Sequence, residues 1–179
     1  MDARAAALGR LDSAGIPYFV TGSEALALWG FGYRQTNDMD VVVDLAVDAY
    51  ERVLRPAFEP DYLVNDLVRT VRRWQGAVIH TREIVKVDLV IRDEDPWGRE
   101  AFGRRVRVDD SALGWVWVST SEDLLLAKLE WTALDQSELQ LRDIRQILRF
   151  APALDLAYVE RHVAALGLVA LWTEVSRDS

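Results

Sequence analysis

Residues 18–44, YFVTGSEALALWGFGYRQTNDMDVVVD, are the stretch that decides the expected fold. Tyr18 to Thr21 is a short apolar run typical of a β-strand, and Gly22-Ser23 interrupts it. Residues 23–29 then have the composition of a helix, and residues 38–44 that of a second strand. A strand, a glycine-serine turn and a helix present backbone N–H groups and a hydroxyl to a phosphate at the start of the helix.

The second strand carries two carboxylates on one face. Asp38 and Asp40 are separated by Met39, so their side chains point the same way. They are about 7 Å apart along the strand, close enough to share hard cations such as Mg²⁺. A phosphate site beside a divalent-metal site predicts phosphoryl or nucleotidyl transfer.

A third carboxylate, Asp88, lies in the apolar run 84–91. Alternation places Asp88 on the same face as Lys86, opposite a wholly apolar face. Taken alone, this aspartate is explained by an ordinary ion pair or by an edge strand facing solvent. Beside Asp38 and Asp40 it predicts a site in which three carboxylates from two strands hold one or two Mg²⁺ ions.

The pattern after Ser119 is helical, with expected helices at 121–134, 138–150 and 155–166. Ser119 and Glu122 fit a capping box at the first of them. Lys128 lies on the apolar side of this helix. Two interpretations remain open: a lysine whose stem crosses apolar surface, or an ammonium group that faces a triphosphate in the cleft.

Asp143 lies level with Lys128 if the chain turns near Gln136 into an antiparallel helical hairpin. Both residues are then about 11–12 Å from the turn, at about 1.5 Å per residue. They are expected to form a pair or to line one pocket. The simpler alternatives are an ordinary interhelical ion pair, or pairing of Asp143 with Arg142 or Arg145.

Taken together, Gly-Ser, Asp-x-Asp and a later aspartate resemble the nucleotidyltransferase fold of the DNA polymerase β superfamily. The run RQTNDMD, residues 34–40, is similar to the Arg-x-Thr-x-Asp-x-Asp motif of AbiEii-like and MenT-like nucleotidyltransferase toxins. In the helical half, the Ser-x-Glu-Asp-Leu, Lys-Leu and Arg-Asp-Ile segments extend the resemblance, which covers roughly residues 18–148. Glu24-Ala25-Leu26 is a mild departure, because many relatives have a small residue and alanine there.

The resemblance implies that Lys128 and Asp143 belong to the active site. With the residues derived above, the expected catalytic set is Asp38, Asp40, Asp88, Lys128 and Asp143, and the expected metal ligands are Asp38, Asp40 and Asp88. The expected nucleotide and phosphate contacts are Gly22, Ser23, Arg34 and Lys128.

The expected fold is α/β (α+β): a small mixed β-sheet core flanked by helices, followed by a C-terminal helical bundle. We expect residues 1–119 to form the nucleotidyltransferase core and residues 120–179 to form a helical subdomain that closes the cleft. A length of 179 residues, half of them hydrophobic, is sufficient for such a core.

Composition restricts the location and the partners. The chain has no cysteine, no signal-like N-terminus and no apolar run of about 20 residues, which favours the cytoplasm and predicts no membrane span. Its net charge is −8, whereas proteins that coat long nucleic acids are usually basic. Any nucleic acid is therefore expected to be held locally, by a pocket or by arginine clusters, with metal ions offsetting the acidic site.

Two further candidates have competing interpretations. Arg69, Arg72 and Arg73 form the densest basic cluster, either a solvated edge or an RNA contact. Trp97, in an expected polar loop or short helix, is a candidate platform for base stacking. The other tryptophans considered, among them Trp115 and Trp117, are expected in the core or facing a partner.

The sequence thus predicts an enzyme of the EC 2.7.7 type that transfers a nucleotide from a nucleoside triphosphate (NTP) to an acceptor hydroxyl. The resemblance implies toxin-like modification of RNA, at a tRNA 3′ end, restrained by a cognate antitoxin. Three alternatives stay open: an aminoglycoside-type enzyme for small molecules, a non-catalytic binding module, and a nucleotidyltransferase-like antitoxin. The NTP, the acceptor, the oligomeric state and the relative importance of Asp88 and Asp143 are left undetermined.

Overall fold

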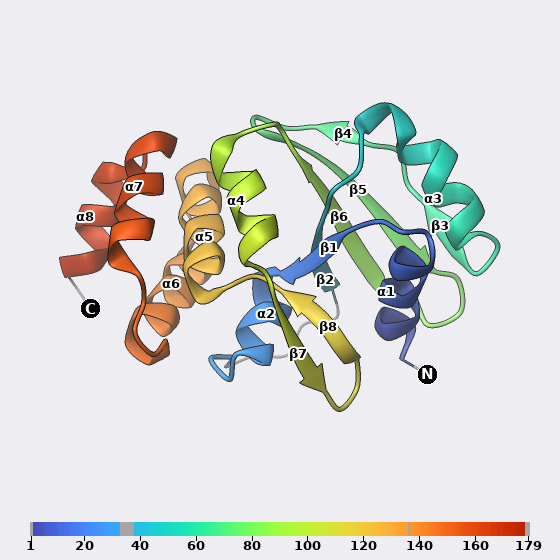
Figure 1. Cartoon of the computed structure of the whole chain (residues 1–179), viewed down its shortest axis with the longest axis horizontal. Coiled ribbons are helices and arrows are strands. Elements are labelled where there is room, and N and C mark those ends of the chain that lie inside the picture. Colours follow the sequence, from blue (N-terminus) through green and yellow to red (C-terminus); the bar gives the residue numbers. More distant parts are fainter. Residues whose placement is uncertain (1, 33–37, 136, 178–179) are drawn as a thin grey trace.

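A computed structural model describes residues 2–32, 38–135 and 137–177 (Figure 1). The elements of the N-terminal half are α1 Ala3–Ser13, β1 Tyr18–Thr21, α2 Gly22–Leu28, β2 Asp38–Val43, the short 3₁₀ helix η1 Val47–Ala49, α3 Tyr50–Phe58, β3 Tyr62–Val64, β4 Val68–Arg69 and β5 Arg73–His80. The later elements are β6 Lys86–Arg92, α4 Pro96–Arg104, β7 Val106–Asp110, β8 Gly114–Val118, α5 Ser121–Asp135, α6 Glu138–Phe150, α7 Leu156–Leu166 and α8 Val169–Arg177.

The strands form one mixed sheet in the order β3-β5-β6-β2-β1-β8-β7, and β4 adds to β5. The pairs β2–β6 and β1–β8 are parallel, whereas the other pairs are antiparallel. Val41, Val43, Val87 and Leu89 are almost fully buried at its centre, as expected for central strands. The predicted mixed α/β fold is confirmed.

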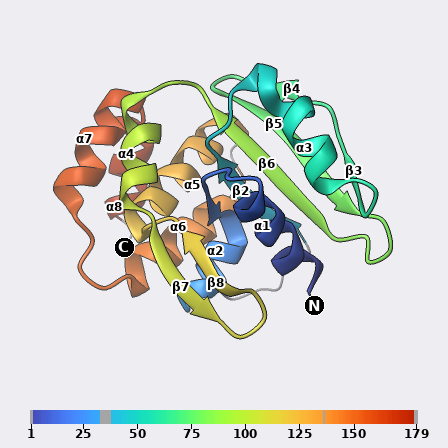
Figure 2. The same cartoon turned by 45° about the vertical axis from the view of Figure 1, so that its right-hand side comes forward.

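Helices lie on both sides of this sheet (Figures 1 and 2). α1 and α3 lie together on one side, and α4 to α8 gather on the other. α5 and α6 pack as an antiparallel pair whose apolar stripes meet, with Leu125 and Leu129 on one helix and Ile144 and Ile147 on the other fully buried. The helical C-terminal segment is therefore a packed layer beside the sheet.

Several boundaries differ from the prediction for local reasons. α5 is capped by Thr120, whose Oγ1 accepts from the Asp123 backbone N–H at 3.2 Å, and not by the predicted box of Ser119 and Glu122. The neighbouring residues offered two overlapping capping patterns, and the one that starts a residue later is used. β5 begins at Arg73 and so includes part of the predicted basic cluster, and a further helix, α8, follows the last helix that the sequence predicts.

Within the three described segments, the helices are all too short or too polar to cross a membrane.

Candidate active site

Gly22 and Asp40 meet at the edge of the sheet where β1 ends. The register pairs Thr21 with Asp40, and Asp40 with Asp88 on the other side. Gly22 has φ +66°, and a Cβ built on it would lie 2.0 Å from Asp40 Oδ2. The carboxylate of Asp40 thus occupies the space that any other side chain at position 22 would need.

We predict that Gly22→Ala lowers the free energy of unfolding by at least about 1–2 kcal/mol, the cost of a left-handed conformation for a residue with a Cβ. The added methyl group also displaces the Asp40 carboxylate, so any nucleotidyl transfer of the kind that the sequence predicts should fall together with stability. Urea unfolding and a transfer assay measure both effects. Gly9→Ala in α1 is the matched control, because nothing lies within 4 Å of its Cβ position, and it should leave activity unchanged. If Gly22→Ala kept the stability and activity of the wild type, the close approach of Gly22 and the Asp40 carboxylate would be contradicted.

The environment of Asp40 shifts its protonation. The pKa of Asp40 is raised to about 6. Burial is the largest cause, the neighbouring carboxylates of Asp88 and Asp38 add to the rise, and Lys128 and Lys86 oppose it. A carboxylate crowded by two others is stabilised in its ionised form by an added cation. The donor chemistry therefore suits a hard metal ion such as Mg²⁺.

The side chains as they stand do not form a closed metal cage. Lys86 Nζ lies 2.7 Å from Asp88 Oδ1, so an ammonium group pairs with the third carboxylate. Among the residues that the structure describes, no three His, Cys, Asp or Glu side chains are grouped closely enough to hold a metal ion. The residue types and their shared face fit Mg²⁺, but binding through Asp88 requires the contact with Lys86 to open.

Lys128 and Asp143 come together as the helical hairpin predicts. Lys128 Nζ donates to Asp143 Oδ2 at 2.7 Å, and the two side chains are 4% and 0% exposed. Lys128 also lowers the pKa of Asp40, so its charge acts on the carboxylate site. The pair joins α5 to α6, and Lys128 lines the same cavity as Asp40. Its catalytic role stays a prediction.

A cavity of about 250 Å³ between the sheet and the helices α4 and α5 brings three predicted residues, Gly22, Asp40 and Lys128, into one site. Its other charged or aromatic lining residues are Phe19, Arg73, Arg92, Trp97, Asp123, Trp131 and Asp135. A more open groove on the other side of Asp40 is lined by Asp66, Lys86 and Asp88. Asp40 and Trp131 line both spaces, so they form the wall between an enclosed and an open compartment.

The remaining predicted residues lie around this site. Ser23 is half-buried in the first turn of α2, and Asp38 is exposed at the start of β2. Asp88 is half-buried on β6. Arg34 lies outside the described residues.

Sequence reasoning missed a buried cluster on the cavity wall. Glu130 of α5 pairs with Arg92 at 2.8 Å and with Arg73 at 3.2 Å. Each guanidinium also lies 4.1 Å from the centre of an indole ring, Arg73 over Trp131 and Arg92 over Trp97. Arg73 Nε has no hydrogen-bond partner among the described residues. The cavity wall that contains Arg73 therefore has one guanidinium N–H group that donates to none of them.

Neither interpretation of the Arg69–Arg73 basic cluster fits all of its members. Arg73 is only 2% exposed, and burial lowers its pKa. Arg69 is exposed but makes two hydrogen bonds to Asp93, at 2.7 and 2.8 Å. Arg69 lies on β4 and Arg73 begins β5, so two different strands position these side chains, and the strand boundaries were the missing signal.

Trp97 is likewise buried, in α4, and is no exposed stacking platform. Its Nε1 donates to Asp123 at 2.9 Å. Asp123 also accepts from Tyr158 Oη at 2.6 Å and from Thr120 Oγ1 at 2.7 Å, so this carboxylate joins α4, α5 and α7. Trp97 forms part of the rigid wall of the cavity.

Comparison with solved structures identifies the architecture. An antigenic nucleotidyltransferase-like protein from Paracoccidioides brasiliensis superposes with a TM-score of 0.57 at 19% identity, over 97% of this chain and 88% of that one. The antibiotic-resistance factor ANT(2″)-Ia gives a TM-score of 0.57 at 13% identity, over 99% of both chains. A second structure of ANT(2″)-Ia, in complex with adenylyl-2″-tobramycin, gives 0.57 at 13% identity, over 92% of this chain and 97% of that one.

No protein-family model matches the chain, and no curated protein sequence matches it either. The similarity therefore concerns three-dimensional structure at low sequence identity, and what it establishes is the fold. The chain has the fold of the nucleotidyltransferase-like proteins.

Proposed function

We propose that this chain is a metal-dependent nucleotidyltransferase of the EC 2.7.7 type, which moves a nucleotide from an NTP to an acceptor hydroxyl. One observation carries the proposal: Gly22, Asp40 and Lys128 line one cavity, with Asp88 paired to Asp40 in register on the adjacent strand. These residues come from four separate elements. A phosphate-binding turn, two carboxylates and a buried ammonium group are the groups that this chemistry needs.

Each residue has a proposed role. Asp38, Asp40 and Asp88 would hold one or two Mg²⁺ ions, which when bound neutralise the triphosphate and acidify the acceptor hydroxyl. The N–H groups of Gly22 and Ser23 bind the β- and γ-phosphates, and Lys128, with Arg34, stabilises the pyrophosphate that leaves. Asp143 orients Lys128, and Asp88 accepts the proton of the acceptor.

The proposed acceptor is RNA, at a tRNA 3′ end, and the proposed setting is a cytoplasmic toxin–antitoxin system. This rests on the resemblance of residues 34–40 and of the helical half to AbiEii-like and MenT-like toxins. In the same proposal, residues 1–119 form the catalytic core, residues 120–179 close the cleft, and a cognate antitoxin is the protein partner.

A small cationic acceptor is the second candidate, and the open groove beside Asp40 favours it. That groove is lined by Asp66 and Asp88 as well as Asp40, against one lysine, Lys86. The net charge of −8 also favours a cationic acceptor over a polyanion. A related fold, ANT(2″)-Ia, has been solved with adenylyl-2″-tobramycin.

One experiment separates the candidates. The purified protein is incubated with Mg²⁺ and each α-labelled NTP in turn, with either total RNA or tobramycin as the acceptor. Label in tRNA supports the favoured function, whereas label only in tobramycin supports the second candidate. No transfer to either acceptor, with nucleotide or protein binding retained, would leave a non-catalytic module or an antitoxin.

A further inference from the structure

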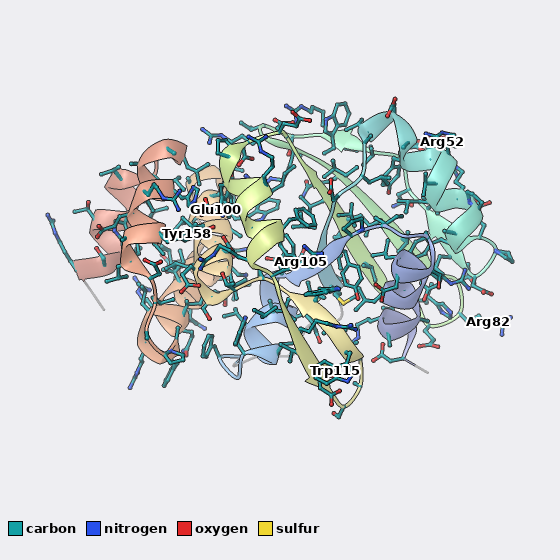
Figure 3. All side chains as sticks on the ribbon, viewed as in Figure 1. Arg52, Arg82, Glu100, Arg105, Trp115 and Tyr158 are labelled. Atoms are coloured by element: carbon teal, nitrogen blue, oxygen red, sulfur yellow. The ribbon has the colours of Figure 1, made fainter. Side chains whose placement is uncertain are left out.

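The β7–β8 hairpin has an outward face built from arginine and tryptophan. β7 is the last strand in the order of the sheet. The inward face of the hairpin carries the four valines Val106, Val108, Val116 and Val118. On the outward face, Arg107 pairs in register with Trp117, and Asp109 with Trp115. Arg105, immediately before β7, extends this face toward α4 (Figure 3).

These outward side chains are stacked in alternation. The guanidinium of Arg105 lies 4.6 Å from the centre of the Trp117 ring. That of Arg107 lies 5.3 Å from Trp117 and 5.9 Å from Trp115. We call the series Arg105, Trp117, Arg107 and Trp115 the Arg-Trp ladder. Trp115, at its outer end, is 60% exposed, which is a large apolar surface to leave in water.

The ladder shares a face of the sheet with the catalytic carboxylates. Val118 pairs with Val20 in parallel register, so Trp117 and Phe19 point to the same side. Phe19 lines the cavity together with Asp40. Two strand spacings of about 4.8 Å and two residues of about 3.3 Å place Trp117 roughly 12 Å from Asp40, a span of a few nucleotides.

The chemistry of the ladder suits one class of ligand. Indole rings stack on bases of any identity, and guanidinium groups pair with phosphates or stack as well. A protein-binding hot spot would need an apolar core around the aromatic rings, but the aliphatic residues of this hairpin point inward. The chain has a net charge of −8, so it would have to hold a nucleic acid through a local group of arginines such as this one.

We infer that the Arg-Trp ladder binds a single-stranded segment of the acceptor RNA and guides its end toward Asp40. Trp115 stacks on a base, and Arg107 contacts the phosphate beside it. The identity of this RNA as the acceptor rests on the proposed function, whereas binding itself does not.

The test is fluorescence anisotropy of the full chain with a labelled, unstructured oligouridine, without NTP or Mg²⁺ so that no transfer takes place. Trp115→Ala should weaken binding about tenfold, the loss of one stacked base. Trp115→Phe keeps an aromatic face and should stay within about threefold of wild type. Arg107→Gln should weaken binding and make it less dependent on salt, because one phosphate contact is lost.

Arg52→Gln is the control for Arg107→Gln. Arg52 is an exposed arginine on α3, far from the hairpin in Figure 3, and its replacement makes the same change in charge. It should bind RNA as wild type does. Circular dichroism and urea midpoints verify that each variant folds, and the exposure of Trp115 makes its replacement mild.

Two results would overturn this inference. One is absence of RNA binding by the wild type, and the other is binding by Trp115→Ala and Arg107→Gln that is as tight as that of the wild type. The inference would also be overturned if Trp115→Ala lost only self-association and still bound RNA as wild type does. RNA binding that depends on the ladder, without transfer to any RNA, would retain the ladder and reject RNA as the acceptor.

Discussion

Replacing Lys128 by methionine is expected to lower the free energy of unfolding by about 3–5 kcal/mol. The substitution removes one member of a buried pair that is 4% and 0% exposed and leaves Asp143 without this cation. The proposed transfer should also fall by about a hundredfold to a thousandfold, because the charge that we propose for the leaving group is lost. Urea unfolding at neutral pH and the rate of label transfer measure the two effects.

The double variant Lys128→Met/Asp143→Leu separates stability from catalysis. It removes both charges and should recover most of the lost stability, since apolar residues of similar size can replace a buried pair. Its transfer should stay low. Arg161→Met is the control at an exposed pair, in which Arg161 is 58% exposed, and it should change stability by less than about 1 kcal/mol. A single variant Lys128→Met as stable as wild type would contradict the buried pair.

Asp40→Asn is expected to reduce transfer on the order of a thousandfold, and yet to stabilise the metal-free protein at neutral pH. The pKa of Asp40 is raised from 3.8 to about 6, chiefly by burial, so the folded state binds this proton more tightly than the unfolded chain. The contribution of Asp40 to stability therefore falls as the pH rises from about 4 to about 6, and it stays low above. Asparagine cannot ionise, so the variant does not lose this stability at neutral pH. The difference is as much as about 3 kcal/mol.

Urea unfolding in EDTA across pH 4 to 8 measures this difference. The free energy of unfolding of Asp40→Asn should exceed that of wild type by the full amount above about pH 6 and by nothing below about pH 4. Asp48→Asn, at an exposed position before α3, is the control and should stay within about 0.5 kcal/mol of wild type at every pH. If Asp40→Asn is less stable than wild type at pH 7, the folded protein does not disfavour the ionised form of Asp40 as this prediction requires.

Local periodicity was enough to predict part of the geometry of the candidate site. The alternation of residues 84–91 puts Asp88 on the same face as Lys86, and the structure pairs it with Asp40 in register. Helical rise and a short turn bring Lys128 and Asp143 together. Alternation within one strand and the rise along two neighbouring helices are nearly independent of the rest of the chain, whereas the pairing of β2 with β6 is not.

Features that depend on the order of the strands were not predictable. Arg73 is buried because Glu130, from a distant helix, lies against it. The Arg-Trp ladder forms because β7 pairs with β8, and it shares a face with Asp40, far away in sequence, because β8 pairs with β1. Single-strand patterns do not specify such pairing, and Trp115 was expected in the core or facing a partner.

The proposed reaction transfers the α-phosphate, with its nucleoside, to a hydroxyl. It is tested most directly by parallel incubations with α-labelled and γ-labelled NTP, with Mg²⁺ and RNA, for wild type and Asp40→Asn. We expect α-label to enter the acceptor while γ-label leaves as pyrophosphate, and we expect both signals to disappear in Asp40→Asn or in EDTA. Entry of γ-label into the acceptor, or equal transfer by wild type and Asp40→Asn, would contradict it.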